Sequence, residues 1–264
     1  MSKIQKAFEQ GKCFIPFLTA GDPSLDKTVE YVLAMADAGA DIIELGIPFS
    51  DPTAEGVVIQ EASLRALNGG FSMEALFEAV QKIREKSDIP LIFMTYINPV
   101  FHYGYEAFFA KCRELGVDGF ISPDLPFEEK EEVSGVAEKY GVDVISMVSP
   151  TSKDRIRRIA EDAEGFVYVV SSMGVTGVRK EFSGNLEETV GQLKQHTKVP
   201  CAIGFGISTP EQAGRMARIS DGVIVGSAIV KIIAGQQENT EADIRSALSS
   251  YVADMKAAVL AAAK

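Results

Sequence analysis

The chain has 264 residues, of which 46% are hydrophobic, and its formal net charge at pH 7 is −11. This acidic balance argues against nucleic acid as a partner, because phosphate backbones bind basic surfaces. No apolar run approaches the roughly 20 residues of a membrane-spanning helix, and residues 1–10 lack the apolar core of a secretory signal, so we expect a cytoplasmic protein.

Short apolar segments recur along the chain and predict strands that are buried on both faces. They span residues 13–19, 42–46, 90–94, 119–122, 142–148, 166–171, 200–204 and 222–225. Amphipathic helical patterns lie between and after them, at residues 26–38, 73–86, 107–115, 128–140, 153–161, 186–195, 210–218 and 241–260. This alternation predicts a closed (β/α)₈ TIM barrel, with a doubly wound open sheet as the alternative. We expect a single domain, 1–264, with an extra N-terminal helix and a short extra helix after the eighth strand.

The segment from 42 to 60, I-I-E-L-G-I-P-F-S-D-P-T-A-E-G-V-V-I-Q, begins as a buried strand and ends as a helix. The predicted strands contain no Lys or Arg, so no neighbouring strand offers Glu44 a partner. A desolvated, unpaired carboxylate has a raised pKa, which suits a general acid/base. The alternative for Glu44 is a structural glutamate bonded to hydroxyls or backbone. Glu55 is either a second working acid or a solvated turn residue.

Glycine-rich turns follow the last three predicted strands. They read Gly174-Val175-Thr176-Gly177, Gly204-Phe205-Gly206 and Gly226-Ser227. In this fold, the loops after strands 7 and 8 and the amino end of a short helix commonly hold a phosphate, although such glycines can also simply make tight turns. Neither a complete G-x-G-x-x-G nor a G-x-x-x-x-G-K-[ST] motif is present in the sequence.

Missing residue types narrow the chemistry further. Three scattered cysteines and two histidines argue against a disulfide framework and against a metal cluster. No lysine lies on a predicted strand to form a Schiff base. With disulfide, metal and Schiff-base chemistry disfavoured, we expect carboxylate acid/base chemistry on a phosphorylated compound. Aromatic residues at or near strand ends could line its pocket: Phe17, Phe93, Tyr96, Tyr168 and Phe205.

Seven motifs match one enzyme family in order. They are F-I-P-F-L-T-A-G-D-P (14–23), E-L-G-I-P-F-S-D-P (44–52), M-T-Y-I-N-P-V-F (94–101), P-D-L-P (123–126), G-V-T-G (174–177), G-F-G-I-S (204–208) and V-G-S-A-I-V-K (225–231). The chain therefore resembles the α subunit of tryptophan synthase over essentially its full length. The resemblance implies a TIM-barrel lyase of tryptophan biosynthesis that cleaves indole-3-glycerol phosphate to indole and D-glyceraldehyde 3-phosphate in a retro-aldol step.

The resemblance also implies roles for individual residues. Glu44 would carry out the acid/base work, and Glu55 would bond the indole N–H and stabilise the charge that develops there. Tyr168 would place the substrate, and a mobile loop after the sixth strand would cover it. The other substrate-binding residues would be Phe17, Tyr96 and Phe205 around the indole ring, and Thr176, Gly177, Gly206, Gly226 and Ser227 toward the phosphate.

A β subunit is the partner that the resemblance implies, in an α₂β₂ assembly. The β subunit would carry pyridoxal phosphate and convert indole and serine to tryptophan, while this chain would use no cofactor. The expected docking positions are Pro48, Asp51, Asn98 and Phe101.

One stretch departs from the family pattern. The family's S-D-P-x-A-D-G-P reads S-D-P-T-A-E-G-V here, with Glu55 in place of aspartate and Val57 in place of proline. A misplacement near 1 Å can cost about 10²-fold in rate. The alternatives are a catalytically weak regulatory subunit that binds the phosphate ligand and activates a β partner, a free-standing indole-producing lyase, and a different phosphosugar enzyme on the same barrel.

Overall fold

The computed structural model describes residues 2–149, 152, 155–171, 186–235 and 241–262. Within these residues nine strands form one parallel sheet in the order β5-β4-β3-β2-β1-β9-β8-β7-β6. The strands are β1 (Cys13–Thr19), β2 (Ile43–Gly46), β3 (Leu91–Met94), β4 (Gly119–Ile121), β5 (Asp143–Val144), β6 (Ser146–Val148), β7 (Val167–Val170), β8 (Cys201–Gly204) and β9 (Gly222–Val225). Because only Ile145 separates β5 from β6, the two ends of the sheet meet there and the sheet closes into a barrel.

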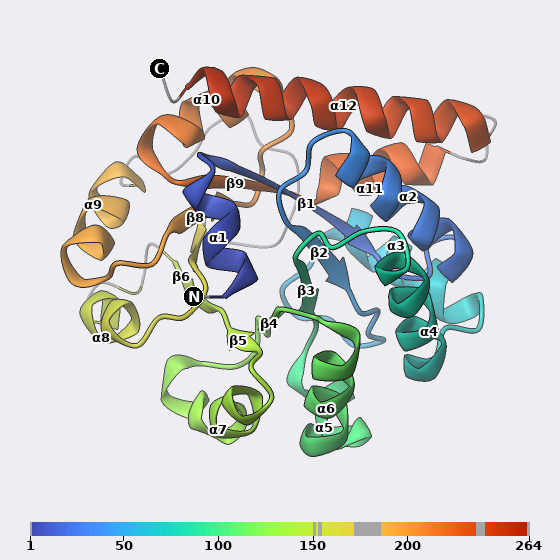
Figure 1. Ribbon diagram of the computed structural model, residues 1–264, viewed down its shortest axis with the longest axis horizontal. Helices are drawn as coiled ribbons and strands as arrows, with labels where there is room; N and C mark the ends of the chain where they lie inside the picture. The colour runs from blue at the N-terminus through green and yellow to red at the C-terminus, as the bar shows by residue number, and fades with distance from the viewer. Residues whose placement is uncertain (1, 150–151, 153–154, 172–185, 236–240, 263–264) are drawn as a thin grey trace.

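Helices surround the barrel in a ring (Figure 1). In the described residues they are α1 (Lys3–Glu9), α2 (Leu25–Asp37), α3 (Val57–Asn68), α4 (Met73–Arg84), α5 (Ile97–Tyr103), α6 (Tyr105–Leu115), α7 (Glu131–Lys139), α8 (Ile156–Glu161), α9 (Leu186–His196), α10 (Pro210–Ile219), α11 (Ser227–Ala234) and α12 (Glu241–Ala261), with a 3₁₀ turn, η1 (Phe127–Glu129). The predicted TIM barrel is confirmed, and the open-sheet alternative is wrong.

Side chains alternate along each strand between two apolar cores. Ile15 and Ile92 belong to the core inside the barrel, whereas Phe14 and Leu91 pack in the shell between the barrel and the helices. Burial on both faces explains why the strands appear in the sequence as nearly continuous apolar runs.

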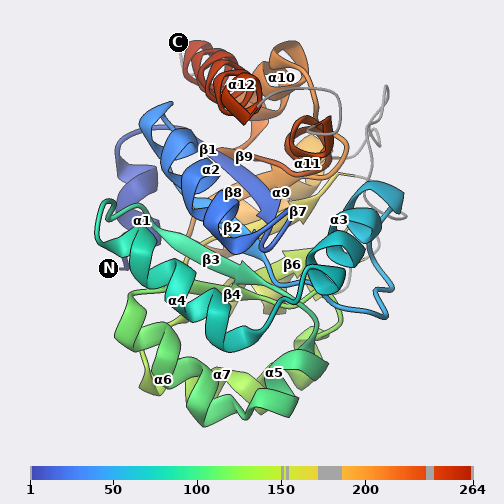
Figure 2. The ribbon, with the colours of Figure 1, turned by 90° about the vertical axis from the view of Figure 1, so that its right-hand side faces the viewer.

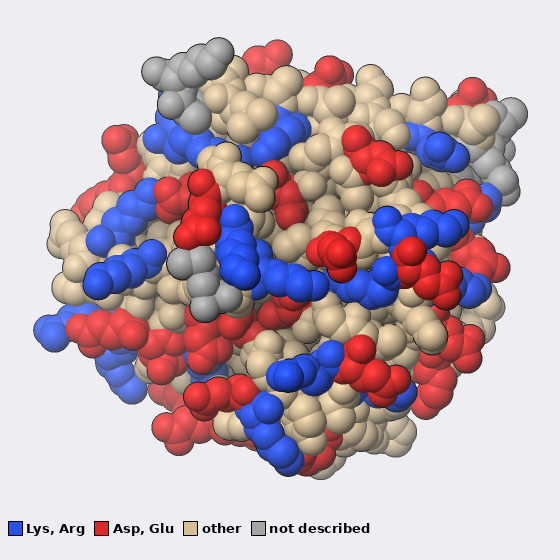
Figure 3. Space-filling view, viewed as in Figure 1, with Lys and Arg blue, Asp and Glu red and all other residues tan. Residues whose placement is uncertain are grey.

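Helix α1 covers the amino-terminal end of the barrel. Its Ile4 is fully buried in the inner core, and the ring of Phe8 lies 5.7 Å from the ring of Phe166. Figure 2 shows the strands running from the end that carries α1 toward the end that carries α3. On the face that carries α1, acidic and basic side chains are interspersed (Figure 3). A functional pocket is therefore expected at the opposite end, where the strands finish.

Some local features differ from the sequence prediction. The single strand predicted over 142–148 is divided at Ile145 into β5 and β6. Helix α5 was not predicted. Its Pro99 falls in the first helical turn, where a proline is tolerated. The helix predicted over 128–140 begins as the 3₁₀ turn η1 and continues as α7. Part of the helix predicted over 153–161 lies outside the described residues.

Candidate active site

A pocket of about 650 Å³ lies at the carboxyl ends of the strands. Its wall is mainly apolar, and it includes two carboxylates, one tyrosine and two glycine turns. Residues that were predicted from sequence as site residues and that line this pocket are Phe17, Glu44, Glu55, Tyr168, Phe205, Gly206, Gly226 and Ser227. The fold therefore brings together residues that are widely separated in the sequence.

Glu44 forms part of the floor of this pocket. It pairs in register with Phe17 of β1 and Ile92 of β3, so its side chain faces the inside of the barrel. Only 1% of the residue is exposed, and among the described residues nothing donates a hydrogen bond to its Oε1. Burial raises the pKa of Glu44 to about 8. Its carboxyl group is therefore mainly protonated at neutral pH and can donate a proton.

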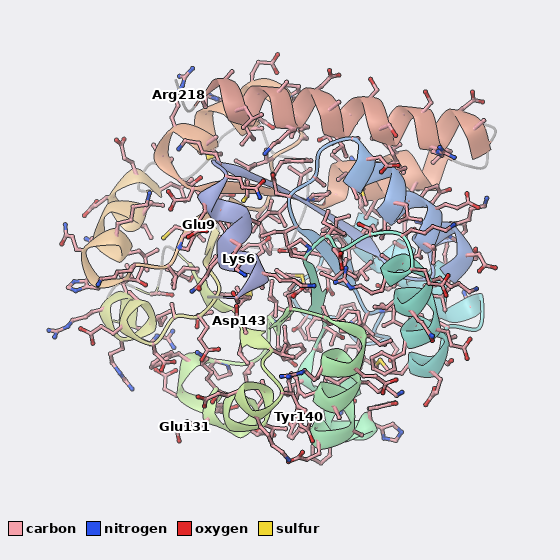
Figure 4. The ribbon with its side chains drawn as sticks, in the orientation of Figure 1. Lys6, Glu9, Glu131, Tyr140, Asp143 and Arg218 are labelled. Carbon is pink, nitrogen blue, oxygen red and sulfur yellow. The ribbon has the colours of Figure 1, made fainter. Side chains whose placement is uncertain are left out.

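Asp143 is a half-buried carboxyl group with one buried oxygen, and it lies at the other end of the barrel. It belongs to β5, and Figure 4 shows it close to α1. Its Oδ2 has no hydrogen-bond partner among the described residues, and burial raises its pKa despite a hydrogen bond from Ser2. A raised pKa alone therefore does not mark the site, whereas position at the carboxyl ends of the strands separates Glu44 from Asp143.

Glu55 is held by a tyrosine that lies behind it. The Tyr96 hydroxyl donates a hydrogen bond to Glu55 Oε2 at 2.7 Å, and it accepts hydrogen bonds from the backbone N–H groups of Thr53 (3.0 Å) and Ala54 (2.8 Å). Burial raises the pKa of Glu55, while the hydrogen bond from Tyr96 lowers it. In the described part of the chain, Glu55 reaches the pocket wall and Tyr96 fixes the loop beneath it.

The turn after β8 has an unusual backbone. Phe205 has a φ of 74° and Gly206 a φ of 76°, and a non-glycine residue in this left-handed region is uncommon. The Ser171 hydroxyl donates a hydrogen bond to the Phe205 carbonyl and so holds the turn. Strained backbone of this kind is concentrated at functional sites.

Helix α11 directs its amino end toward the same part of the pocket. It begins at Ser227 after the cap residue Gly226, and no side chain of the described residues caps its first turn. Both residues line the pocket. Uncapped N–H groups and the helix dipole make this turn a favourable position for an anion.

Two aromatic residues of the pocket depend on glycines of the next strand. A side chain at Gly46 would overlap the ring of Phe17, and a side chain at Gly204 would overlap the hydroxyl of Tyr168. Tyr168 also packs edge-on against Phe205, with ring centroids 6.0 Å apart. Gly46 and Gly204 thus leave the space into which these rings project.

Several residues of the pocket wall were missed by sequence reasoning. They are Ala54, Ile59, Met94, Pro123, Met147, Ile207 and Ile224. Met94, Met147 and Ile224 occupy inward positions near strand ends, so counting the alternation from the buried strand residues could have found them. Ile59 comes from α3, where an apolar residue gives no sign of which cavity it faces. Thr176 and Gly177, predicted to bind substrate, lie outside the described residues.

The predicted partner-contact residues differ in exposure. Asp51 and Asn98 are exposed, and Phe101 of α5 is 65% exposed. Pro48 is buried. Three of the four residues are therefore accessible to a partner protein, whereas Pro48 is not.

Comparison with known proteins identifies the family. The family model described as "Tryptophan synthase alpha chain" matches residues 4–260. The chain belongs to the tryptophan synthase alpha chain family. The tryptophan synthase alpha chain of Lacticaseibacillus casei is 52% identical over 244 residues, which are 92% of each chain. That of Alkaliphilus metalliredigens is 53% identical over 233 residues, or 88% of each chain.

Solved structures give the same result. The tryptophan synthase alpha chain of Legionella pneumophila has a TM-score of 0.88 at 38% identity, covering 98% of this chain and 97% of that chain. A chain of Mycobacterium tuberculosis tryptophan synthase has a TM-score of 0.88 at 33% identity and covers 98% of both chains. As a tryptophan synthase alpha chain, the protein is a lyase that carries out the alpha reaction, the cleavage of indole-3-glycerol phosphate to indole and D-glyceraldehyde 3-phosphate.

The described residues contain neither a membrane-spanning helix nor a metal-binding cluster. No helix in them has both the length and the apolar character needed to cross a membrane. They also contain no group of three or more His, Cys, Asp or Glu side chains that could hold a metal ion.

Proposed function

We propose that Glu44 transfers the protons of the alpha reaction, that Glu55 holds the indole nitrogen, and that the turns after β8 and β9 hold the phosphate. The observation that carries this proposal is the Glu44 carboxyl group at the floor of the pocket, which is buried, has an oxygen without a partner among the described residues, and has a pKa raised by burial to about 8.

The order of the strands supports one orientation of the substrate. In the closed barrel, β8 and β9 lie across from β3 and β4. A phosphate at Gly206, Gly226 and Ser227 places the glycerol chain over the centre of the barrel. The indole ring then extends toward the far side, where Glu55 can accept a hydrogen bond from its N–H group.

Glu44 alone can make both proton transfers of the reaction. Protonated Glu44 donates its proton to indole C3, and the positive charge that this creates at the ring nitrogen is stabilised by the Glu55 carboxylate. The Glu44 carboxylate then removes the proton from the hydroxyl on the adjacent carbon. The bond between that carbon and C3 breaks, its electrons return to the ring, and the hydroxyl carbon becomes the aldehyde. Glu44 ends protonated, as it began.

Glu55 can serve in place of the family's aspartate because Tyr96 fixes its position. The hydroxyl of Tyr96 contacts both the Glu55 carboxylate and the loop backbone, so the longer side chain has an anchor at its carboxyl end. Since the contact also favours the ionised form of Glu55, it supports the acceptor role.

We also infer the setting in which the chain works. It forms one domain, needs no cofactor of its own, and acts in the cytoplasm with a β subunit that carries pyridoxal phosphate, in an α₂β₂ assembly. Asp51, Asn98 and Phe101 supply docking surface beside the pocket loops, and Pro48 supports the loop from beneath.

The proposal is tested by replacing Glu44 with glutamine. Purified wild-type protein incubated with indole-3-glycerol phosphate should release indole, with and without a β subunit, and Glu44→Gln should lower kcat by the 10²- to 10⁴-fold expected for loss of an acid/base group. Asp143→Asn is the matched control, because it replaces a carboxyl group whose pKa is also raised by burial but which lies at the opposite end of the barrel. Its kcat should stay close to the wild-type value.

Two results would count against the proposal. If Glu44→Gln keeps more than about a tenth of the wild-type rate, Glu44 is not the acid/base group. If the wild-type protein releases no indole in either condition but stimulates the β subunit, the regulatory alternative is correct.

A further inference from the structure

Beyond Met147 the substrate pocket adjoins a second space. This cavity of about 870 Å³ shares Ala54, Pro123, Met147 and Phe205 with the substrate pocket. It continues between the loops that follow β4 and β6, where Ser122 and other residues of those loops line it. Among the described residues, the side of the pocket that Met147 lines is therefore not closed by a continuous wall.

Met147 stands between the two spaces. It lies in β6. Met147 packs against the inner core with Ile145, which directly precedes β6, whereas Val148 packs in the outer shell, so the Met147 side chain points into the barrel. It is partly exposed and lines both cavities. Methionine is unbranched and flexible, and it adapts its shape to what packs beside it. A small movement of this side chain would enlarge the substrate pocket toward the adjoining cavity.

The orientation of the indole ring decides which of its atoms faces Met147. Glu55 and its anchor Tyr96 lie on the β2–β3 side of the pocket, whereas Met147 lies on the β6 side. In indole, C7 is on the same side of the ring system as the N–H group, and C4 and C5 are on the other side. An N–H group that bonds Glu55 therefore places C7 beside the Glu55 loop and turns the C4–C5 edge toward Met147.

We propose that the enzyme accepts indole-3-glycerol phosphates substituted at ring carbon C5, and that Met147 is the residue that sets this specificity. This inference rests on the proposed orientation of the substrate. A C5 substituent enters the space that Met147 shares with the adjoining cavity. A C7 substituent meets the Glu55 loop, which Tyr96 holds in place.

The test compares three substrates: unsubstituted, 5-methyl and 7-methyl indole-3-glycerol phosphate. Formation of glyceraldehyde 3-phosphate gives the same readout for all three. For the wild-type enzyme, kcat/KM for the 5-methyl substrate should lie within about threefold of the unsubstituted value, whereas that for the 7-methyl substrate should fall at least about tenfold, the usual cost of a misplaced methyl-sized group.

Met147→Phe should fill the space and lower the ratio of 5-methyl to unsubstituted kcat/KM by about tenfold. Met94→Phe is the matched control, because Met94 lines the substrate pocket and is absent from the described lining of the adjoining cavity. This change should leave the ratio within about threefold of the wild-type value. Circular dichroism establishes that each variant is folded. The comparison of the three substrates on the wild-type enzyme tests the proposal independently of whether the variants fold.

The outcomes separate this inference from the proposed function. If the unsubstituted substrate yields no product, the result contradicts the proposed function itself. If it is cleaved but the 5-methyl and 7-methyl substrates are rejected equally, or if Met147→Phe and Met94→Phe change the ratio equally, the assignment of Met147 is overturned.

Discussion

Among the described residues, the Glu44 carboxyl group combines burial, an unpartnered oxygen and a position at the mouth of the barrel. Asp143 also has an unpartnered oxygen, but it is half-buried, is bonded by Ser2 and lies at the other end, and Glu55 shares the position but has a hydrogen-bond donor in Tyr96. The two carboxyl groups of the pocket therefore differ in environment: burial alone raises the pKa of Glu44, whereas the hydrogen bond from Tyr96 partly offsets the effect of burial on the pKa of Glu55 and favours its role as an acceptor.

This separation predicts the pH dependence of the reaction. Burial raises the pKa of Glu44 to about 8, so its proton is present below that pH and is lost above it. We expect kcat/KM to fall about tenfold per pH unit above pH 8, because this parameter reports the free enzyme. The decline on the acid side should shift in Glu55→Asp and not in Asp143→Asn. A rate that stays constant up to pH 9.5 would contradict the role of Glu44 as the initial proton donor.

The role of Glu44 could be predicted from the sequence, but the contacts of the residues around it could not. An acid in an apolar strand without Lys or Arg on the neighbouring strands is visible in the sequence. The hydrogen bond between Tyr96 and Glu55 is not, because it joins residues 41 positions apart through a loop whose path depends on the whole fold. Met147 was also not predicted as a residue of the pocket, although the alternation of inward and outward residues along its strand marks it as inward-facing.

Among the secondary-structure elements, α3 is tied to the loop after β1 by an ion pair. Arg65 of α3 donates from Nε and Nη2 to the two carboxylate oxygens of Asp22, at 2.8 and 2.7 Å. The Asp22 side chain is only 3% exposed. Since α3 also contributes Ile59 to the pocket, this bidentate contact fixes one wall of the site.

Removal of the Arg65 side chain should therefore lower stability and activity together. Arg65→Ala leaves the buried Asp22 carboxylate unpaired, and we expect a loss of roughly 3 kcal/mol in the free energy of unfolding, measured with urea. Lys82→Ala breaks the exposed pair between Lys82 and Asp26 and is the control, with a loss below about 1 kcal/mol. Equal losses in the two variants would mean that the Asp22–Arg65 pair contributes no more than a surface pair.

The boundaries of the elements show where local sequence signals fail. The apolar run from 142 to 148 is continuous, yet pairing changes from β4 to β7 along it, and the strand is divided at Ile145. Such a change of partner comes from barrel closure and leaves no mark in the local pattern.

At the scale of the whole molecule, the repeating strand–helix pattern was enough to predict the barrel. What it could not predict is how the two ends differ. Helix α1 fills one end, whereas α3, α5 and the loops after the strands surround the other, where Phe101 remains exposed (Figure 2). Aromatic residues are enriched at protein–protein interfaces, so Phe101 is a candidate contact residue.

Phe101→Ser should weaken binding to a β subunit without loss of the isolated chain's own activity. Phe101 is 65% exposed and lines no part of the described pocket, so the substitution removes contact area and leaves the site intact. We expect the dissociation constant, measured by titration calorimetry, to rise at least about tenfold, as for a central aromatic contact. The indole release rate of the chain alone should stay within about twofold. An unchanged dissociation constant would remove Phe101 from the docking surface.

Between α1 and Glu44 the inner core is packed by fully buried side chains, among them Ile4, Ile15, Ile42 and Phe166. Among the described residues, this packing closes the amino-terminal end of the barrel. Substrate and both products therefore have to pass through the opposite end, where the strands finish and the entrance to the pocket lies. A protein seated over that entrance would control the traffic of all three molecules without touching Glu44.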